Sequence, residues 1–262
     1  MSFVHPYIPN SVPKIKEEMM KSLGISSMEE IYSGIIPEAL RFRGKMDLPQ
    51  PIHTEFELKN HVAGILNRNT STEEADSFLG AGCYKHFIPA LCDEVAGRAE
   101  FLTAYCGDTY SDHGKMQAIF EYTSMMGELL DMEVVSYTCY DASQAAASSM
   151  RMALRLNPGR DVLLVPSTMN PVILSVVREY CRHLAKLEVV ACDPRSGLMD
   201  LGDLKQRLKS GKTAAVYFEN PSYLGFLETG CREIANLARS DGALCIVSPE
   251  VASLGVMESP AN

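Results

Sequence analysis

Four apolar runs that alternate with helical segments constrain the fold of this chain more than any other feature. The runs are Val162–Pro166, Leu187–Ala191, Ala214–Phe218 and Ala243–Val247, and their starts lie 25 to 29 residues apart. Helices are expected between them at Pro171–Leu184, Leu201–Leu208 and Cys231–Arg239. Strands that are apolar on both faces are typical of a parallel sheet covered by helices on both sides. We therefore predict an α/β fold with a mainly parallel sheet.

The residues before this sheet are expected to be helical. Apolar residues at helical spacing predict a helix over Lys115–Leu130 that buries Met116 and Phe120, and an Ala-rich helix follows at Ala142–Leu156. Shorter helical segments, broken by Pro and Gly, fill the N-terminal region. The sequence thus predicts a helical N-terminal arm at residues 1–75 and a large α/β domain at residues 76–262.

Charge and composition exclude several classes of function. The formal net charge of −9 and the pI near 5.2 argue against nucleic acid or an anionic membrane surface as a partner. Apolar stretches stay well short of the roughly 20 residues that span a bilayer, and MSFVHPYIPN does not resemble a secretory signal. A cytoplasmic protein is expected. Cys83 and His86 form one C-x-x-H pair, which lacks two further ligands, so no metal site is expected.

Short motifs spread over the chain carry a resemblance to a known family. They include FLGAGCYKHFIPA from Phe78, FLTAY from Phe101, QAIFE from Gln117 and the dipeptide Tyr140-Asp141. PYIPNS near the N-terminus and ENPSYLGFLE from Glu219 follow the same pattern. Together they resemble subunit 1 of the decarboxylating glycine dehydrogenase, the P-protein of the glycine cleavage system.

The resemblance implies a fold and a reaction. The fold would be that of pyridoxal-phosphate-dependent transferases of fold type I. The chain would complete a pyridoxal phosphate site with a second P-protein subunit, which decarboxylates glycine and passes the aminomethyl group to the lipoyl H-protein. The family chain continues beyond the SLG segment at Ser253, so the resemblance also implies that the large domain is incomplete at its C-terminal end.

Cofactor-binding candidates lie at one helix start and after one strand. Tyr140, Asp141 and Ser143 form a polar turn before the Ala-rich helix, where free N–H groups bind anions such as a phosphate; the alternative is a simple helix cap. Glu250 stands where the family has an aspartate after a strand, a position that would suit the pyridine nitrogen. A solvent-facing carboxylate is the alternative for Glu250.

The catalytic candidates come from a loop that departs from the family. Tyr105 and His113 belong to the segment Tyr105–Gly114, which in the family lines the glycine site, but the family's PYQPE core is absent here. A histidine suits proton transfer near neutral pH, whereas a lone loop histidine is commonly only solvated.

The lysine that forms a Schiff base with the cofactor is not expected on this chain. None of the 11 lysines follows a predicted strand in an S-x-x-K or H-K setting, and in two-subunit members of the family that lysine belongs to the second subunit. Two other readings stay open: a catalytically silent scaffold or regulatory homologue that has lost the glycine loop, and an independent pyridoxal phosphate enzyme of related fold.

Overall fold

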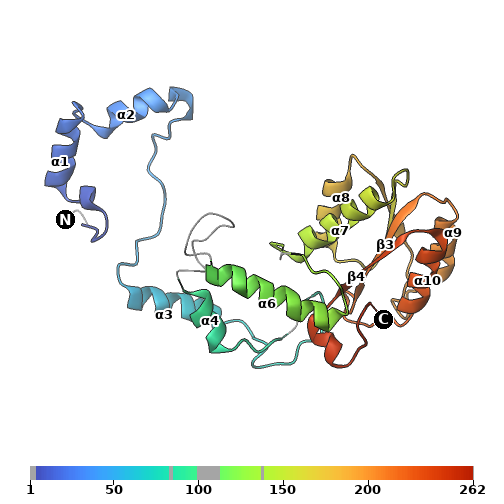
Figure 1. Ribbon diagram of the computed structural model, residues 1–262. Coiled ribbons are helices and arrows are strands. Elements are labelled where there is room, and N and C mark those ends of the chain that lie inside the picture. Colours follow the sequence, from blue (N-terminus) through green and yellow to red (C-terminus); the bar gives the residue numbers. More distant parts are fainter. Residues whose placement is uncertain (1–3, 83–84, 99–112, 137–138, 262) are drawn as a thin grey trace. The chain divides into compact units, whose positions relative to one another are not determined.

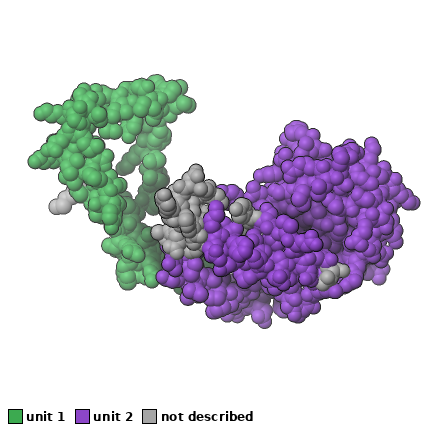
Figure 2. Space-filling model, viewed as in Figure 1, with its two compact units in different colours: residues 1–69 green, residues 70–262 purple. Residues whose placement is uncertain are grey.

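The computed structural model describes residues 4–82, 85–98, 113–136 and 139–261. The chain divides into two compact units, residues 1–69 and residues 70–262 (Figure 2). The predicted boundary between an arm and a large domain lay at residues 75 and 76, and this assignment of domains stays a prediction. None of the helices in the described ranges is long and apolar enough to cross a membrane.

Unit 1 consists of short helices, and none of its described residues is buried. Its elements are η1 (Pro9–Ser11), α1 (Pro13–Ser22), α2 (Met28–Ile35), η2 (Glu38–Leu40) and α3 (Glu55–Leu66). Helix α3 begins directly after its N-cap Thr54, whose hydroxyl accepts a hydrogen bond from the Glu57 N–H at 3.2 Å.

Unit 2 contains a parallel sheet, which confirms the predicted α/β fold (Figure 1). Strands β1 (Val162–Pro166), β2 (Lys186–Val190), β3 (Thr213–Asn220) and β4 (Leu244–Pro249) pair in the order β2-β1-β3-β4, and every pairing is parallel. The helices of this unit are α4 (Ala90–Ala96), α6 (His113–Leu130), α7 (Ala142–Leu156), α8 (Pro171–Cys181), α9 (Leu201–Leu208), α10 (Cys231–Asp241) and η4 (Val251–Gly255).

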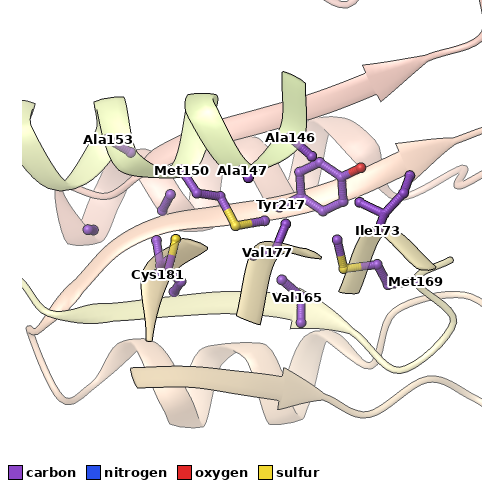
Figure 3. Packing of buried hydrophobic residues seen from close by; sticks show 13 residues of the cluster. Ala146, Ala147, Met150, Ala153, Val165, Met169, Ile173, Val177, Cys181 and Tyr217 are labelled. Atoms are coloured by element: carbon purple, nitrogen blue, oxygen red, sulfur yellow. The ribbon is translucent and has the colours of Figure 1, made fainter. Parts of the chain in front are cut away.

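Each face of the sheet packs against its own pair of helices, as predicted for strands that are apolar on both sides. On one face, Met150 of α7 and Val177 of α8 pack against Val165 and Tyr217, and all four side chains are buried (Figure 3). On the other face, Leu204 of α9 and Ile234 of α10 pack against Leu164, Val216 and Phe218. Burial of these side chains from water supplies the main stabilisation of the sheet.

Helix α7 runs antiparallel to the strands. At its C-terminal end, the Asn157 side chain donates to the Ala214 carbonyl at 3.1 Å, at the start of β3. Arg160 reinforces this end of the sheet, because its guanidinium donates to the Thr213 carbonyl at 2.8 Å and to Asp241 Oδ2 at 2.9 Å. The N-terminus of α7 therefore lies toward the other end of the sheet, where the strands finish; we call this end the carboxyl edge.

The expected burial of the helix before the sheet is wrong. Met116 and Phe120 of α6 are 44% and 66% exposed. Helical spacing identifies the apolar face of a helix, but it does not say whether another element covers that face. Within the described residues this face of α6 remains open to solvent at Met116 and Phe120.

Candidate functional site

The predicted anion site at the start of α7 lies at the carboxyl edge. Side chains of the same segment already accept hydrogen bonds from some of the N–H groups there. Asp141 is the N-cap, and its carboxylate accepts a hydrogen bond from the Gln144 N–H at 2.7 Å. The Gln144 side chain in turn accepts from the Tyr140 N–H at 3.1 Å. The Tyr140 side chain is 97% exposed, whereas Ser143 is buried. The capping role that the sequence allowed for Asp141 is thus present.

The exit loop (residues 220–228) follows β3 at the same edge. It begins with a cis peptide bond between Asn220 and Pro221. The buried Asn220 side chain holds the loop closed, because its Oδ1 accepts from the Glu228 N–H at 3.1 Å. The Asn220 carbonyl also accepts from the Glu250 N–H at 3.4 Å, which joins the loop to the end of β4.

Glu219 connects the exit loop to helix α8. Its carboxyl oxygens accept hydrogen bonds from the Asn170 N–H, at 3.3 Å for each oxygen, and from the Tyr223 N–H at 3.2 Å. Asn170 is the N-cap of α8, since its side chain accepts from the Val172 N–H at 2.9 Å. Glu219 is only 8% exposed. Burial raises the pKa of its carboxyl, although the two N–H groups and the Tyr217 hydroxyl act in the opposite direction.

The small-residue turn at Gly80 packs against this loop. Gly80 has a φ of +63°, and a methyl group added there would come within 2.8 Å of the Leu224 carbonyl oxygen. The FLGAG and ENPSYLG motifs, which are far apart in the sequence, therefore meet at one edge, together with Asn170 at the start of α8. The sequence did not reveal this meeting, because nothing in the separate motifs specifies their contact.

The predicted site residues differ in how the structure places them. Glu250 follows β4 at the carboxyl edge and caps η4, with its carboxylate accepting from the Ala252 N–H at 3.4 Å. Tyr105 and Cys83 lie outside the described residues. His113 begins α6, but its side chain lies outside what the structure describes. The roles of Tyr105, His113, Tyr140, Asp141, Ser143 and Glu250 stay predictions.

The residues at the carboxyl edge suit binding of the phosphate group of pyridoxal phosphate better than they suit covalent attachment of this cofactor to a lysine. The first turn of the 15-residue helix α7, which contains the buried Ser143, offers N–H groups to an anion. Lys186 and Lys212, by contrast, stand at the opposite end of the sheet, before or at the start of their strands. Lys205 lies on α9, where it pairs with Glu233. None of these three lysines comes from the carboxyl edge.

Two buried polar residues at this edge were not among the predicted site residues. Glu219 is the next-to-last residue of β3, and Tyr217 precedes it on the same face of the strand. A signal was present: a carboxylate inside the apolar run AAVYFEN, directly before Asn-Pro, marks a charged group that a buried strand must accommodate.

Comparison with known proteins gives the family. The glycine cleavage system P-protein family matches residues 5–262. A probable glycine dehydrogenase (decarboxylating) subunit 1 from Staphylothermus marinus is 34% identical, with 98% of this chain and 56% of the relative covered. The corresponding protein from Pyrococcus horikoshii is 37% identical, with 98% and 56% covered. The chain spans about half the length of the curated relatives that it matches.

Solved structures agree with this result. A crystal structure of the glycine decarboxylase (P-protein) of the glycine cleavage system in inhibitor-bound form has a TM-score of 0.73 and 29% identity, and covers 99% of this chain and 56% of its own. Oryza sativa TDC with PLP and tryptamine shares the fold at a TM-score of 0.54 and 10% identity, with 94% of this chain and 58% of its own covered. These matches confirm fold type I, and the chain belongs to the glycine cleavage system P-protein family.

Proposed function

We propose that this chain acts as the subunit of a cytoplasmic glycine decarboxylase that does not carry the Schiff-base lysine. The observation that carries the proposal is the family match over residues 5–262, together with relatives that are named as subunit 1 of a decarboxylating glycine dehydrogenase. A numbered subunit implies a second subunit. The meeting of two family motifs, FLGAG and ENPSYLG, at the carboxyl edge of the sheet supports the same conclusion, because ligands of open α/β sheets bind at this edge.

The proposed reaction breaks the bond between the α-carbon and the carboxylate of glycine. Carbon dioxide leaves, and the aminomethyl carbon then bonds to one sulfur of the lipoyl disulfide of an H-protein. The S–S bond breaks, and the other sulfur becomes a thiol. Pyridoxal phosphate, when bound, supplies the electron sink that this decarboxylation requires.

The residues of this chain would bind and orient. The first-turn N–H groups of α7 and the Ser143 hydroxyl suit a phosphate group, with Tyr140 and Asp141 at the mouth of the same turn. Glu250 would present a carboxylate from the end of β4. Tyr105 and His113 would contribute to the glycine site from the loop before α6. The second subunit would supply the lysine.

A glycine-dependent exchange assay with labelled bicarbonate tests the proposal. This chain would be assayed alone and together with a lysine-bearing second subunit, H-protein and pyridoxal phosphate. We expect exchange only in the complete mixture. In that mixture, Tyr105→Phe should lower the exchange rate, whereas Tyr180→Phe, at an exposed position of α8, serves as the matched control and should leave it unchanged.

Each outcome has a clear meaning. Exchange by this chain alone would contradict the assignment of the lysine to the partner. A stable complex that exchanges no label would overturn the catalytic proposal and leave the chain as a scaffold. Equal effects of Tyr105→Phe and Tyr180→Phe would remove Tyr105 from the site.

A further inference from the structure

The Tyr217 hydroxyl is a buried polar group that no described residue engages in a hydrogen bond of normal geometry. Tyr217 is 1% exposed, and its polar neighbours are Ser248 and Glu219. Burial and the nearby Glu219 raise the pKa of the phenol, so the hydroxyl keeps its proton at neutral pH. A buried hydroxyl without a partner destabilises the folded state, because it has lost its hydrogen bonds to water. Phenylalanine would fill the same space without this cost, so the hydroxyl requires an explanation.

The hydroxyl points toward the first turn of α7. Figure 3 shows the Tyr217 ring beneath α7, with the hydroxyl directed past Ala146 rather than toward Met150. Because α7 runs antiparallel to the strands, this direction leads to its N-terminus at the carboxyl edge. The buried face of α7 contains Ser143, Ala146 and Met150 at helical spacing, so Ser143 is the next residue of this face beyond Ala146. The hydroxyl is therefore aimed at the turn that contains Ser143.

This first turn has two N–H groups that are free to bind an anion. The Asp141 carboxylate accepts from the Gln144 N–H, and the Asp141 carbonyl accepts from the Ala145 N–H at 3.2 Å. No described residue accepts from the N–H groups of Ala142 and Ser143. These two groups lie at the positive end of the helix dipole, where an anion is favoured.

The acidic neighbour Glu219 is held by other groups. It lies two residues beyond Tyr217 on the same face of β3. Its carboxyl oxygens accept from the N–H groups of Asn170 and Tyr223, which direct it toward the start of α8 and the exit loop. A hydrogen bond to this carboxylate is the alternative use of the Tyr217 hydroxyl. The two uses predict different effects of Tyr217→Phe on the stability of the ligand-free chain.

We propose that Tyr217 is a phosphate-binding residue: its hydroxyl donates a hydrogen bond to a phosphate group that the N–H groups of Ala142 and Ser143 bind at the carboxyl edge. The bound phosphate gives the hydroxyl the acceptor that it lacks in the ligand-free chain. A hydrogen bond to an anion is strong where water is excluded. The identity of the ligand, pyridoxal phosphate, rests on the proposed function, whereas binding of a phosphate group is a property of this chain alone.

Isothermal titration calorimetry of the full chain with pyridoxine phosphate tests the proposal. This compound carries the phosphate but no aldehyde, so it forms no Schiff base with lysine side chains. We expect saturable binding to wild type, and Tyr217→Phe should raise the Kd about tenfold or more, as for a lost hydrogen bond to a charged group. A wild-type chain that does not bind the compound, or an equal Kd for the two proteins, would overturn the proposal.

Two further ligands identify the group that is recognised. Pyridoxine, which lacks the phosphate, should not bind at the same concentrations, and binding as tight as that of pyridoxine phosphate would overturn the proposal. Inorganic phosphate should compete with pyridoxine phosphate. If inorganic phosphate binds equally tightly and loses the same factor in Tyr217→Phe, the phosphate site is supported and its assignment to the cofactor is not.

Thr213→Val is the matched control. Thr213 carries the other buried hydroxyl without a partner in the described part of the chain, and it begins β3 at the opposite end of the sheet from the carboxyl edge. This variant should leave the Kd for pyridoxine phosphate unchanged. An equal rise in Kd for Thr213→Val and Tyr217→Phe would assign the loss to a general change in β3 and overturn the proposal.

Thermal unfolding separates a ligand-binding role from a structural one. Loss of an unpartnered hydroxyl should leave the thermal midpoint of ligand-free Tyr217→Phe equal to that of wild type or higher. Saturating pyridoxine phosphate should then raise the midpoint of wild type more than that of the variant. A midpoint clearly below that of wild type in the ligand-free variant would show that the hydroxyl serves Glu219, which would overturn the proposal.

The bicarbonate exchange assay keeps this inference distinct from the proposed function. In the complete mixture, Tyr217→Phe should need more pyridoxal phosphate than wild type for half-maximal exchange. An unchanged requirement would contradict a role of Tyr217 in holding the cofactor. If the mixture exchanges no label at all, the proposed function fails, and the calorimetry of the full chain still decides the role of Tyr217.

Discussion

At the scale of single residues, the buried carboxyl of Glu219 makes the stability of the chain depend on pH. Burial raises the pKa of this group in the folded state above its value in the unfolded chain. The folded state therefore binds the proton more tightly, and the stability contributed by the neutral acid is lost as the pH rises from the unfolded pKa through the folded pKa.

Glu219→Gln should remove this loss. Urea unfolding of both proteins between pH 4 and pH 8 should show the free energy of unfolding of the variant rising relative to that of wild type as the pH increases. A constant difference between the two proteins across this range would contradict the expectation.

Gly80 illustrates a second constraint at this scale. Gly80→Ala would combine a left-handed backbone with a clash against the Leu224 carbonyl oxygen. Gly211 has the same φ of +63° and open space around it, so Gly211→Ala measures the cost of the left-handed backbone conformation without a clash. Gly211→Ala should cost about 1 kcal/mol in free energy of unfolding. Gly80→Ala should cost roughly 1–3 kcal/mol more, because a backbone atom must move. Equal losses in urea unfolding would show that the turn adjusts freely.

At the scale of elements, the N-cap of α7 decides where the helix begins at the predicted cofactor site. Asp141→Ala removes the acceptor for the Gln144 N–H and should lower the free energy of unfolding by about 1 kcal/mol. Asp141→Asn keeps a capping oxygen and should cost only a few tenths of that amount. Far-UV circular dichroism during urea unfolding would measure both variants, and an equal loss in the two would assign the effect to charge rather than to capping.

The elements also show what the sequence could and could not predict. Strand β1 and helix α7 have the predicted bounds, because a fully apolar run and a capped Ala-rich segment are strong local signals. Strand β3 extends two residues past the predicted end, through Glu219 and Asn220. A carboxylate and an amide at the end of a run are typical of a loop, and their burial depends on partners from α8 and the exit loop. The burial of α6 was predicted wrongly for the same reason, since the local spacing of apolar residues carries no information about tertiary contacts.

At the scale of the whole molecule, the two units contribute differently to stability. Both core clusters consist of residues of unit 2, beginning at Ala146, whereas the described residues of unit 1 include no buried side chain. Cooperative unfolding is governed chiefly by such buried clusters. The arrangement of strands β1 to β4 and helices α7 to α10 should therefore hold without residues 1–69.

A chain that consists of residues 70–262 tests this expectation. Its thermal midpoint, followed by circular dichroism, should lie within a few degrees of the full chain, since a change of 1 kcal/mol shifts the midpoint of a domain of this size by about 2–4 °C. Leu204→Ala within the shortened chain is the control for a lost core contact. It removes a fully buried side chain and should cost about 2–5 kcal/mol. If deletion of residues 1–69 destabilises the sheet as much as Leu204→Ala does, unit 1 contributes to its stability by contacts outside the two clusters.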